Sequence, residues 1–468
     1  MKKLLIFIFC FIFAFPFSVL ASAEEEEAVK TANGYYDIEA PGYTTEIALL
    51  VNADTDTVVY SKNADKVTAP ASLAKIVTAM VALQKCDNLQ TVITCSQKAI
   101  TSLNGTGSST VGLKAGEKIT LEMLLYCMFL SSANDAAAVI ADYFGKGNSA
   151  AFVADMNKYV ADLGCKDTYF ANPHGLDDEK VKGYEAKTQN KTTANDMYLI
   201  AKAAIADDNI VKISSKYGKT IPKTNLHDER NIYNSNPLLN NYSYYYYEGA
   251  IGLKNGYTSK AGCCLVSAAT KDGYTYISIA MKGNDNYVDG GEKRNTAYLM
   301  CRYMLKWAFS NIKMKVLADT SYNVGEIAVK YGRGADYVAL VPKDDITAIV
   351  HEDLDVESVT IEYAADFPEK IKAPVKQGEE IGKATVVYKG VKIADVTLVA
   401  QQDVKKNYLW AMFSWLETLM SSKLFIVIVI LVVVAIIVLL LSTSKQRKRK
   451  KRLKNRIDIV KDYSKLSK

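Results

Sequence analysis

Apolar residues recur at helical spacing a short way into the chain. The pattern i, i+3, i+4, i+7, i+8 predicts a helix that begins near Pro70 and buries one face, and its apolar positions are Leu73, Ile76, Val77, Met80 and Val81. Lys75 stands among them, three residues after Ser72. Because residues three apart are neighbours on a helix surface, this pair has the spacing of a nucleophile and its base.

Other stretches predict a mixture of strands and helices. Residues 46–60 predict two strands around the turn "NADTD", and residues 121–129 predict an apolar helix. The runs "CCLVSAAT" and "YTYISIAM" are rich in strand-forming residues and are separated by "KDG", which indicates a hairpin. A further helix is predicted over about residues 296–309. We therefore expect an α+β domain over residues 24–312.

A different pattern follows. Short alternating runs such as "VTIEY", in which Ile361 and Tyr363 share a face, predict a small all-β domain over residues 313–400. Residues 401–423 then contain several amphipathic aromatic side chains, which suit a membrane interface. We expect this segment to be a juxtamembrane linker.

Two long apolar segments lie near the ends of the chain. Residues 1–23 have two lysines, an apolar stretch and a final "ASA", which is typical of a signal peptide cleaved after Ala23. An uncleaved N-terminal anchor is the alternative. Residues 424–441 are eighteen consecutive apolar residues, enough for one transmembrane helix. Residues 442–468 form a basic tail, and the positive-inside rule predicts that it is cytoplasmic and that the main body is outside.

Charge and composition exclude several classes. The net charge is +6, but the tail contributes +10 and the signal peptide +2, so the part between them is mildly acidic at −6. A basic tail directly after a spanning helix is expected to set the orientation of that helix and to be attracted to anionic lipid. We therefore expect no nucleic-acid partner. The eight cysteines include no C-x-x-C pair, so neither a disulfide framework nor a metal site is legible, and no cofactor is expected. Only three histidines leave little support for a Ser-His-Asp triad.

Ser72 is distinguished by its context. A serine three residues before a lysine is weak evidence by itself, because the chain repeats this spacing at Ser310/Lys313 and Ser442/Lys445. Ser72 lies just after Pro70, a residue favoured in the first helical turn, so its backbone N–H is expected to be an unbonded donor that can bind an oxyanion. Lys75 can act as a base only where burial and a second cation lower its pKa.

Two later motifs complete an ordered set. "LSSAND" contains Ser132 and Asn134, and "GLKNGYT" contains Lys254 with Asn255 and Gly256. Taken alone, Ser132 and Asn134 also fit the role of helix caps. The order Ser-x-x-Lys, Ser-x-Asn, Lys-Thr-Gly is nonetheless that of penicillin-binding proteins and class A β-lactamases, and this chain has Lys-Asn-Gly as the third motif.

The chain resembles the D-alanyl-D-alanine carboxypeptidases among the low-molecular-mass penicillin-binding proteins, in the serine β-lactamase-like superfamily. The similarity covers about residues 40–400, including "PASLAKIVTAMVAL", "FANPHGLDD" and "KAPVKQGEEIGK". It implies a transpeptidase-like domain, an antiparallel sheet with a helical subdomain, followed by a small all-β domain. It also implies hydrolysis of the terminal D-alanine of peptidoglycan stem peptides, with β-lactam antibiotics as covalent inhibitors.

The resemblance also assigns roles. Ser72 would attack the carbonyl between the last two D-alanines, Lys75 would take its proton, and Ser132 would relay a proton to the leaving amine. The substrate would be bound by six further residues, which are Asn134, Lys254, Asn255, Gly256, Tyr257 and Thr258. Asn255 departs from the family pattern, which has threonine there, and this puts the grip on the terminal carboxylate in question.

Several residues have an ordinary structural interpretation. His174 in "NPHGL" is expected to be a hydrogen-bonded loop residue, and the tyrosine run over residues 242–247 suits packing or a loop surface better than a sugar platform. Cys263 and Cys264 are expected to be small buried apolar residues.

Two alternative functions remain open at this stage. A β-lactamase would need rapid deacylation, and the sequence offers no convincing glutamate for it. A catalytically weak penicillin-binding fold, acting as a wall-binding or signalling module, draws on Asn255 and the basic tail.

The apolar segment and the basic residues after it predict a testable topology. Protease added outside intact cells should digest residues 24 to about 420 and leave a tag on the tail intact, because the lysines and arginines hold that end inside. Immunoblotting of a tail tag measures this, with permeabilised cells as the control. Digestion of the tag in intact cells would reverse the orientation.

Overall fold

The computed structural model describes residues 41–177, 189–388 and 391–465. The expected signal peptide and its cleavage site lie outside these residues. The described chain divides into two compact units, one formed mainly by residues up to Lys315 and the other mainly by the residues after it. Each unit is described by itself.

The first unit is built on a five-stranded antiparallel sheet with the order β2-β1-β9-β8-β7. Its strands are β1 (Ile47–Asn52), β2 (Thr57–Lys62), β7 (Ala250–Thr258), β8 (Gly262–Lys271) and β9 (Tyr274–Gly283). The hairpin expected at "KDG" is confirmed: Lys271 pairs with Tyr274, and Asp272 and Gly273 have φ of 53° and 83°. These positive values are those of a two-residue type I′ turn.

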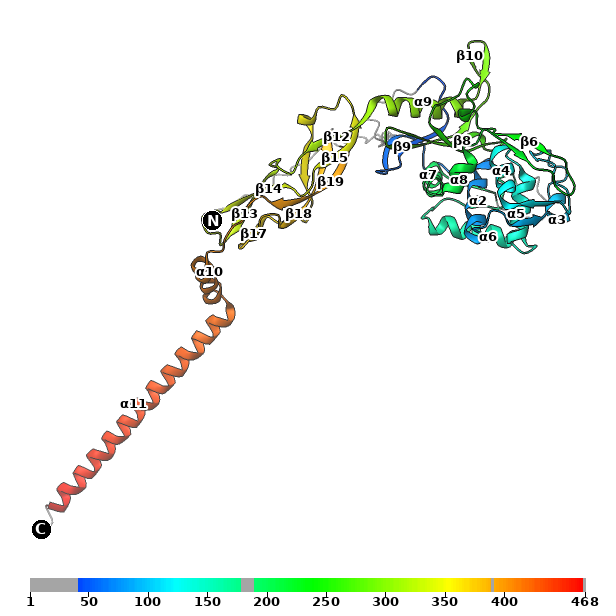
Figure 1. The fold of residues 1–468 in the computed structure, drawn as a ribbon. Coiled ribbons are helices and arrows are strands. Elements are labelled where there is room, and N and C mark those ends of the chain that lie inside the picture. The colour runs from blue at the N-terminus through cyan, green and yellow to red at the C-terminus, as the bar shows by residue number, and fades with distance from the viewer. Residues whose placement is uncertain (1–40, 178–188, 389–390, 466–468) are drawn as a thin grey trace, which may run out of the picture. The chain divides into compact units, whose positions relative to one another are not determined.

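Helices cover both faces of this sheet (Figure 1). One group consists of α2 (Ala74–Lys85), α3 (Gln97–Thr101), α4 (Leu121–Leu130), α5 (Asn134–Phe144), α6 (Ser149–Asp162), α7 (Ala194–Ile205) and α8 (Asp208–Ser214). Helix α9 (Thr296–Asn311) packs on β8 and β9. Three small strand pairs complete the unit: β3 (Val92–Thr94) with β4 (Lys118–Thr120), β5 (Gly218–Ile221) with β6 (Arg230–Tyr233), and β10 (Tyr287–Asp289) with β11 (Glu292–Arg294).

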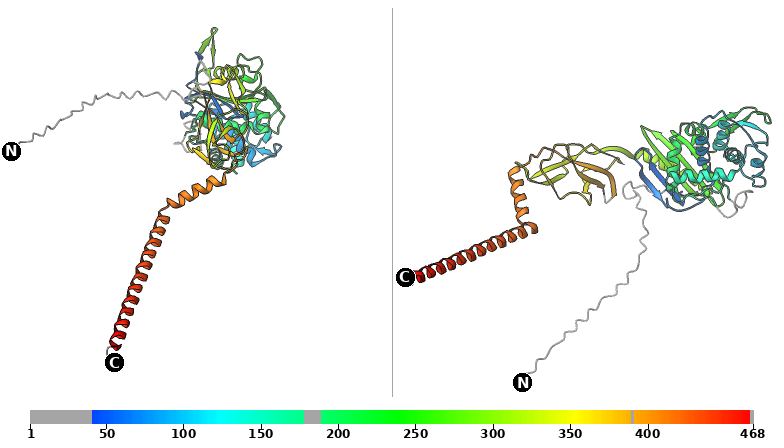
Figure 2. Two further views of the ribbon diagram at one scale, coloured as in Figure 1. Left: turned by 90° about the vertical axis from the view of Figure 1, so that its left-hand side faces the viewer. Right: turned by 90° about the horizontal axis from the view of Figure 1, so that it is seen from below.

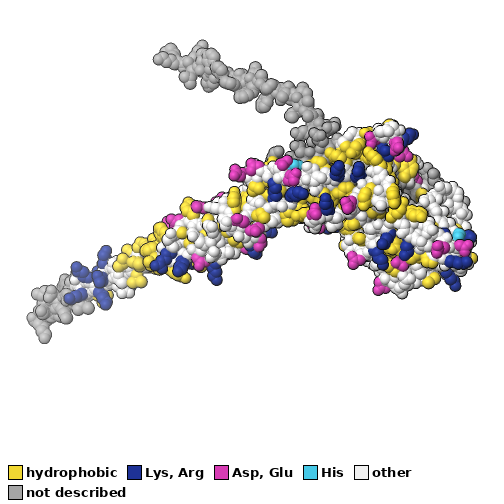
Figure 3. Space-filling view, turned by 45° about the horizontal axis from the view of Figure 1, so that its top comes forward, with side chains coloured by type: hydrophobic (Ala, Val, Ile, Leu, Met, Phe, Trp, Pro, Cys, Tyr) yellow, Lys and Arg dark blue, Asp and Glu magenta, His cyan; other side chains and the backbone are white. Residues whose placement is uncertain are grey.

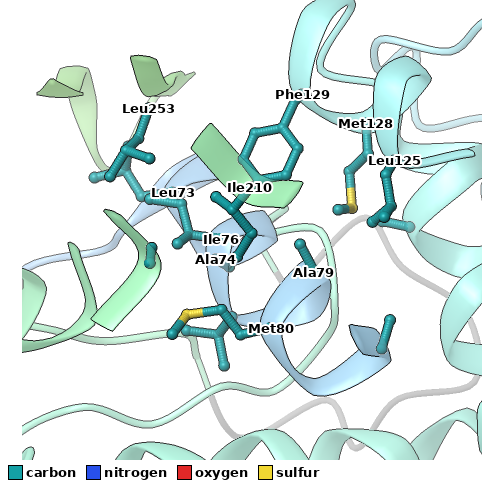
Figure 4. Packing of buried hydrophobic residues seen from close by; sticks show 14 of the residues in the cluster. Leu73, Ala74, Ile76, Ala79, Met80, Leu125, Met128, Phe129, Ile210 and Leu253 are labelled. Carbon is teal, nitrogen blue, oxygen red and sulfur yellow. The ribbon is translucent and has the colours of Figure 1, made fainter. Parts of the chain in front are cut away.

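Helix α2 lies at the centre of the core. The apolar pattern predicted a helix with one buried face, but every residue from Ala74 to Ala82 is buried, Lys75 included. Figure 4 shows why: residues of α4 and α8 and Leu253 of β7 surround it. Because α2 is enclosed by other elements, Lys75 is removed from water. On an amphipathic surface helix a lysine would instead lie on the face exposed to solvent.

The second unit contains the expected all-β domain, which precedes the C-terminal helices. Its six-stranded sheet has the order β16-β18-β19-β14-β13-β17, formed by β13 (Gly325–Lys330), β14 (Tyr337–Pro342), β16 (Thr360–Tyr363), β17 (Lys370–Lys372), β18 (Glu380–Tyr388) and β19 (Val391–Ala400). Strands β12 (Ile312–Ala318) and β15 (Ile346–His351) form a separate two-stranded sheet, and most of their residues are assigned to the first unit. Strand β16 is an edge strand, so Ile361 is only half-buried and Tyr363 is exposed, stacking on Phe367. The predicted alternation there is weaker than a central strand would show.

Two helices end the described chain, α10 (Tyr408–Met420) and α11 (Lys423–Lys465). The first lies within the expected linker and exposes Trp410, Phe413 and Trp415. The second contains the predicted spanning segment and is, among the described residues, the one helix long and apolar enough to cross a membrane. It continues without a break into the basic tail (Figure 2), and Figure 3 shows the apolar stretch followed by lysines and arginines.

The seven cysteines of the described chain are all unpaired. Five of them are buried, Cys263 and Cys264 among them, as expected for small apolar residues. Burial raises the pKa of the Cys127, Cys264 and Cys301 thiols to about 12.

Candidate active site

Ser72 lies in a short 3₁₀ turn, Ala71–Leu73, which follows Pro70 and leads directly into α2. Lys75 is in the first turn of that helix. The three-residue spacing places the Nζ of Lys75 2.9 Å from the Oγ of Ser72, within hydrogen-bond distance. The sequence therefore predicted this pairing correctly, since both residues belong to one local helical segment.

Lys75 is fully buried, and its second partner comes from a distant part of the chain. Its Nζ donates to the backbone carbonyl of His174 over 2.9 Å. Burial holds the pKa of Lys75 well below its usual range, and the positive charge of Lys254 lowers it further, while Asp135 opposes the shift. A neutral amine beside a serine hydroxyl can accept its proton.

The segment that presents the His174 carbonyl packs tightly against the serine turn. A Cβ on Gly175 would overlap the Ala71 carbonyl, and Gly175 has φ of 83°, so only glycine fits there. Asn172 fixes the turn by accepting from the Gly175 N–H over 2.7 Å. Burial and the nearby Lys75 hold the pKa of the His174 imidazole well below its usual range, so the ring is neutral. Its Nδ1 accepts from the Leu176 N–H over 3.3 Å, which confirms a hydrogen-bonded loop residue.

Ser132 and Asn134 lie where α4 ends and α5 begins. The N-cap of α5 is Ala133, and neither Ser132 nor Asn134 occupies that position. Ser132 has φ of 53°, a left-handed conformation that non-glycine residues seldom adopt, and among the described residues it forms no hydrogen bond with Ser72 or Lys75. The Oδ1 of Asn134 is buried and has no hydrogen-bond partner in the described part of the chain. Such an acceptor suits a ligand amide.

Asp135 is a buried carboxyl group that the motif analysis did not single out. It accepts backbone N–H groups of Val111, Leu113 and Ala136 at 3.0 to 3.2 Å. Burial raises its pKa, and these hydrogen bonds oppose the rise. Asp135 therefore ties the loop before β4 to the start of α5, close enough to Lys75 to affect its charge state.

Lys254 is buried on β7, an edge strand of the main sheet. Its Nζ donates to the Asn255 carbonyl over 2.9 Å and to the Asn255 Oδ1 over 3.0 Å. Burial lowers the pKa of Lys254 to about 7. The sequence required a second cation near Lys75, and the structure provides Lys254 in that role.

Asn255 has all its amide atoms engaged within the protein. Its Nδ2 donates to the Ser235 carbonyl over 3.1 Å and to the Tyr298 hydroxyl over 2.9 Å. Its Oδ1 accepts from the Ser235 hydroxyl as well as from Lys254. Both amide hydrogens are therefore already used within the protein and are not free for a substrate carboxylate. Sequence reasoning could not find these partners, because they lie on separate segments.

The next residues of β7 bring the strand against the nucleophile turn. A Cβ on Gly256 would lie 2.7 Å from the Ser72 nitrogen, so glycine permits the close approach. Tyr257 follows with its side chain exposed. The Thr258 hydroxyl donates to Asp177 over 3.3 Å and accepts from the Ala261 N–H over 3.0 Å. Ser72, Lys75 and the Lys254 to Gly256 stretch thus gather at one place, and no group of three metal-ligating side chains occurs in the described ranges.

Two family profiles match the chain. The one described as D-alanyl-D-alanine carboxypeptidase, peptidase S11, matches residues 36–285, which is more than half of the sequence. The one described as the C-terminal domain of penicillin-binding protein 5 matches residues 313–406.

Individual relatives agree with the profiles. The chain is 28% identical over 361 residues to the D-alanyl-D-alanine carboxypeptidase DacF of Bacillus subtilis (strain 168), covering 77% of this chain and 85% of the relative. It is 32% identical over 241 residues to the D-alanyl-D-alanine carboxypeptidase of Streptomyces sp. (strain K15), covering 49% of this chain and 78% of the relative. Its fold is similar to that of penicillin-binding protein 5 from Haemophilus influenzae, with a TM-score of 0.55 and 26% identity over 79% of this chain and all of the other.

These matches confirm the expected penicillin-recognising α+β domain and the all-β domain after it. The expected apolar C-terminal helix is present in the structure as a candidate membrane span. They favour an active hydrolase over the alternative of a catalytically weak wall-binding module. The chain belongs to the D-alanyl-D-alanine carboxypeptidase family of serine peptidases, which bind penicillin.

Proposed function

We propose that Ser72 is the nucleophile and Lys75 the general base of this carboxypeptidase, which removes the terminal D-alanine from peptidoglycan stem pentapeptides. The observation that carries the proposal is the 2.9 Å contact between Lys75 Nζ and Ser72 Oγ inside a fully buried site. Burial lowers the pKa of Lys75 well below its usual range, which favours the neutral amine, and a neutral amine has a lone pair for the serine proton.

Acylation then proceeds by addition to the carbonyl followed by elimination of the amine. As Lys75 takes the proton, Ser72 Oγ bonds to the carbonyl carbon between the last two D-alanines, and the carbonyl oxygen becomes an oxyanion. The backbone N–H groups of Ser72 and Tyr257 stabilise that charge. The close packing of β7 on the serine turn supports this assignment, because it brings the two segments together. Ser132 passes its proton to the leaving nitrogen and takes the proton held by Lys75 in its place, so Lys75 is neutral again. The oxyanion re-forms the carbonyl as the C–N bond breaks, and free D-alanine departs.

Deacylation returns the enzyme to its first state. A water molecule gives a proton to Lys75 and attacks the Ser72 ester, and the proton then passes to Ser72 as the ester bond breaks. A β-lactam follows the same first step, and its acyl-enzyme persists where water is excluded.

Substrate binding rests on groups at both sides of the serine. The unpartnered Oδ1 of Asn134 accepts a substrate amide N–H. Lys254 and Thr258 attract the terminal carboxylate, and Gly256 lets the peptide backbone lie along β7. Asn255 belongs to this group through its contacts with Lys254, which fix the position of the ammonium.

The proposed placement of the protein in the cell follows from its ends. Residues 1–23 direct export, residues 24–312 form the carboxypeptidase domain and residues 313–400 the β-rich domain. Residues 401–423 link it to a spanning helix over residues 424–441, with residues 442–468 in the cytoplasm. One long apolar helix supports the anchor.

The assignment of Ser72 is tested with a fluorescent penicillin. Ser72→Ala is expected to abolish covalent labelling, because the bond to the drug forms at Ser72 Oγ. In-gel fluorescence measures the labelling. Ser310→Ala is a matched control, since Ser310 also precedes a lysine by three residues, and it should label like the wild type. Equal labelling of Ser72→Ala would rule out the nucleophile.

The role of Lys254 is tested by the pH dependence of acylation. The acid limb reports protonation of Lys75 and the alkaline limb loss of the proton from Lys254, whose pKa is about 7. Lys254→Met removes a positive charge that lowers the pKa of Lys75, so the pKa of Lys75 rises and the acid limb moves to higher pH. Stopped-flow acylation measures both limbs.

A control for this experiment is Lys271→Met, at the exposed end of β8, which should leave both limbs in place. An acid limb that stays unchanged in Lys254→Met would show that the two lysines are not coupled.

Asn255→Thr tests the grip on the terminal carboxylate. The amide hydrogens of Asn255 are bonded to Ser235 and Tyr298, whereas a threonine hydroxyl would be free to donate to the substrate. A hydrogen bond to a charged group contributes about 1.5 to 3 kcal/mol, so kcat/KM for a D-Ala-D-Ala peptide should rise by about 10- to 150-fold. D-alanine release measures this, and penicillin acylation should change less. A fall in peptide turnover would instead identify the asparagine as an adapted contact.

A further inference from the structure

A cavity of about 340 Å³ lies along α9, and none of its lining residues belongs to the serine site. Its helix residues recur three and four apart, so they form one continuous stripe: Leu299, Arg302, Tyr303, Lys306, Trp307, Ser310 and Asn311. Tyr43 and Tyr244 complete the walls. At about 1.5 Å per residue the stripe is roughly 18 Å long, and the volume lies within the range of small-molecule sites.

The walls of this α9 pocket are aromatic and held in place. The Tyr43 ring lies edge-to-face against Tyr303, with centroids 6.3 Å apart, and against Tyr287 at 5.6 Å. The Tyr244 hydroxyl donates to Asp289 over 2.7 Å, and the Arg294 guanidinium lies 3.9 Å from the Tyr244 ring centroid. Rings that are already fixed lose little entropy when a ligand packs against them.

Positive charge is available inside the same pocket. The Nε of Arg302 donates to the Tyr246 carbonyl over 3.2 Å, which orients the guanidinium, and Lys306 is exposed one turn further along. No carboxylate in the described part of the chain forms an ion pair with either residue. Arginine presents its donors as a planar fork that matches a carboxylate or phosphate.

Aromatic walls, cations and the neutral polar groups of Ser310 and Asn311 together define the ligand chemistry. A pyranose ring has C–H faces that pack on aromatic rings and hydroxyls that bind polar groups, and an anionic substituent would pair with arginine. We propose that the α9 pocket binds an acidic saccharide, that is, a pyranose with a carboxylate or phosphate group. The tyrosine run over residues 242–247 was expected to serve packing or a loop surface rather than a sugar platform, and the proposed sugar site departs from that expectation by including Tyr244.

The pocket is connected to the substrate strand through α9. Tyr244 contacts Tyr245 with ring centroids 5.7 Å apart, and Tyr245 contacts Tyr298 at 5.3 Å. Tyr298 accepts from Asn255 beside Lys254. A wall polymer that carries both sugar and peptide could therefore be held at two places on one rigid unit, which raises the effective concentration of its peptide.

The test uses the full-length protein in detergent, first acylated with benzylpenicillin so that the serine site is closed. Three probes share a pyranose ring: N-acetylmuramic acid has a carboxylate, N-acetylglucosamine 1-phosphate has a phosphate, and N-acetylglucosamine has neither. Calorimetry should show at least one acidic sugar binding about 10-fold or more tightly than the neutral one, the scale of one hydrogen bond to a charged group. Which acid binds better separates a carboxylated glycan from a phosphate-containing polymer.

Two variants locate the binding. Arg302→Gln should bring the acidic and neutral sugars to within about 2-fold of each other, and Trp307→Leu should weaken all three. Tyr242→Ala, whose side chain is 90% exposed in the same tyrosine run, should change nothing. Penicillin labelling checks that each variant is folded.

The proposal is overturned if no probe binds, if the neutral sugar binds as well as the acidic ones, or if Arg302→Gln leaves the preference unchanged in a protein that still labels. Because the serine site is closed throughout, these outcomes do not depend on whether Ser72 is the nucleophile.

Discussion

The site depends on one energetically unfavourable feature, the burial of the Lys75 side chain inside the first unit. An ammonium removed from water without a paired carboxylate costs several kcal/mol, so the group gives up its proton instead. The neighbouring elements then have to satisfy a neutral amine. The Ser72 hydroxyl and the His174 carbonyl do so, both at 2.9 Å. The enclosure of α2 is thus the reason that a lysine can act as a base here.

Three separate segments have to converge for this burial to hold. The 3₁₀ turn with Ser72 is confined between the loop that contains Gly175 and the strand that contains Gly256, and each glycine lies where a Cβ would meet the turn. Lys254 approaches from the edge strand and brings a second positive charge near Lys75. The packing of these segments therefore also sets the electrostatics of the site, because the contacts that exclude water from Lys75 bring Lys254 close to it.

Local patterns in the sequence predicted most of the fold. The hairpin at Asp272, the helix after Pro70 and the spanning segment depend on neighbours in the chain, so periodicity and turn residues sufficed. The motif set brought Ser72, Lys75 and Lys254 together by resemblance. What escaped prediction involves backbone atoms or distant partners: the His174 carbonyl is 99 residues from Lys75, and Asn255 is satisfied by Tyr298. A backbone carbonyl can come from any residue type, so it leaves no trace in composition.

The unpaired cysteines have a consequence for how the protein matures. The Cys264 and Cys301 thiols are fully buried and remain protonated, since burial raises their pKa to about 12. A protonated thiol is a poor nucleophile for disulfide exchange. The buried thiols are therefore not expected to enter disulfide exchange while the core is closed, and an oxidant should first reach the half-buried Cys86 and Cys165.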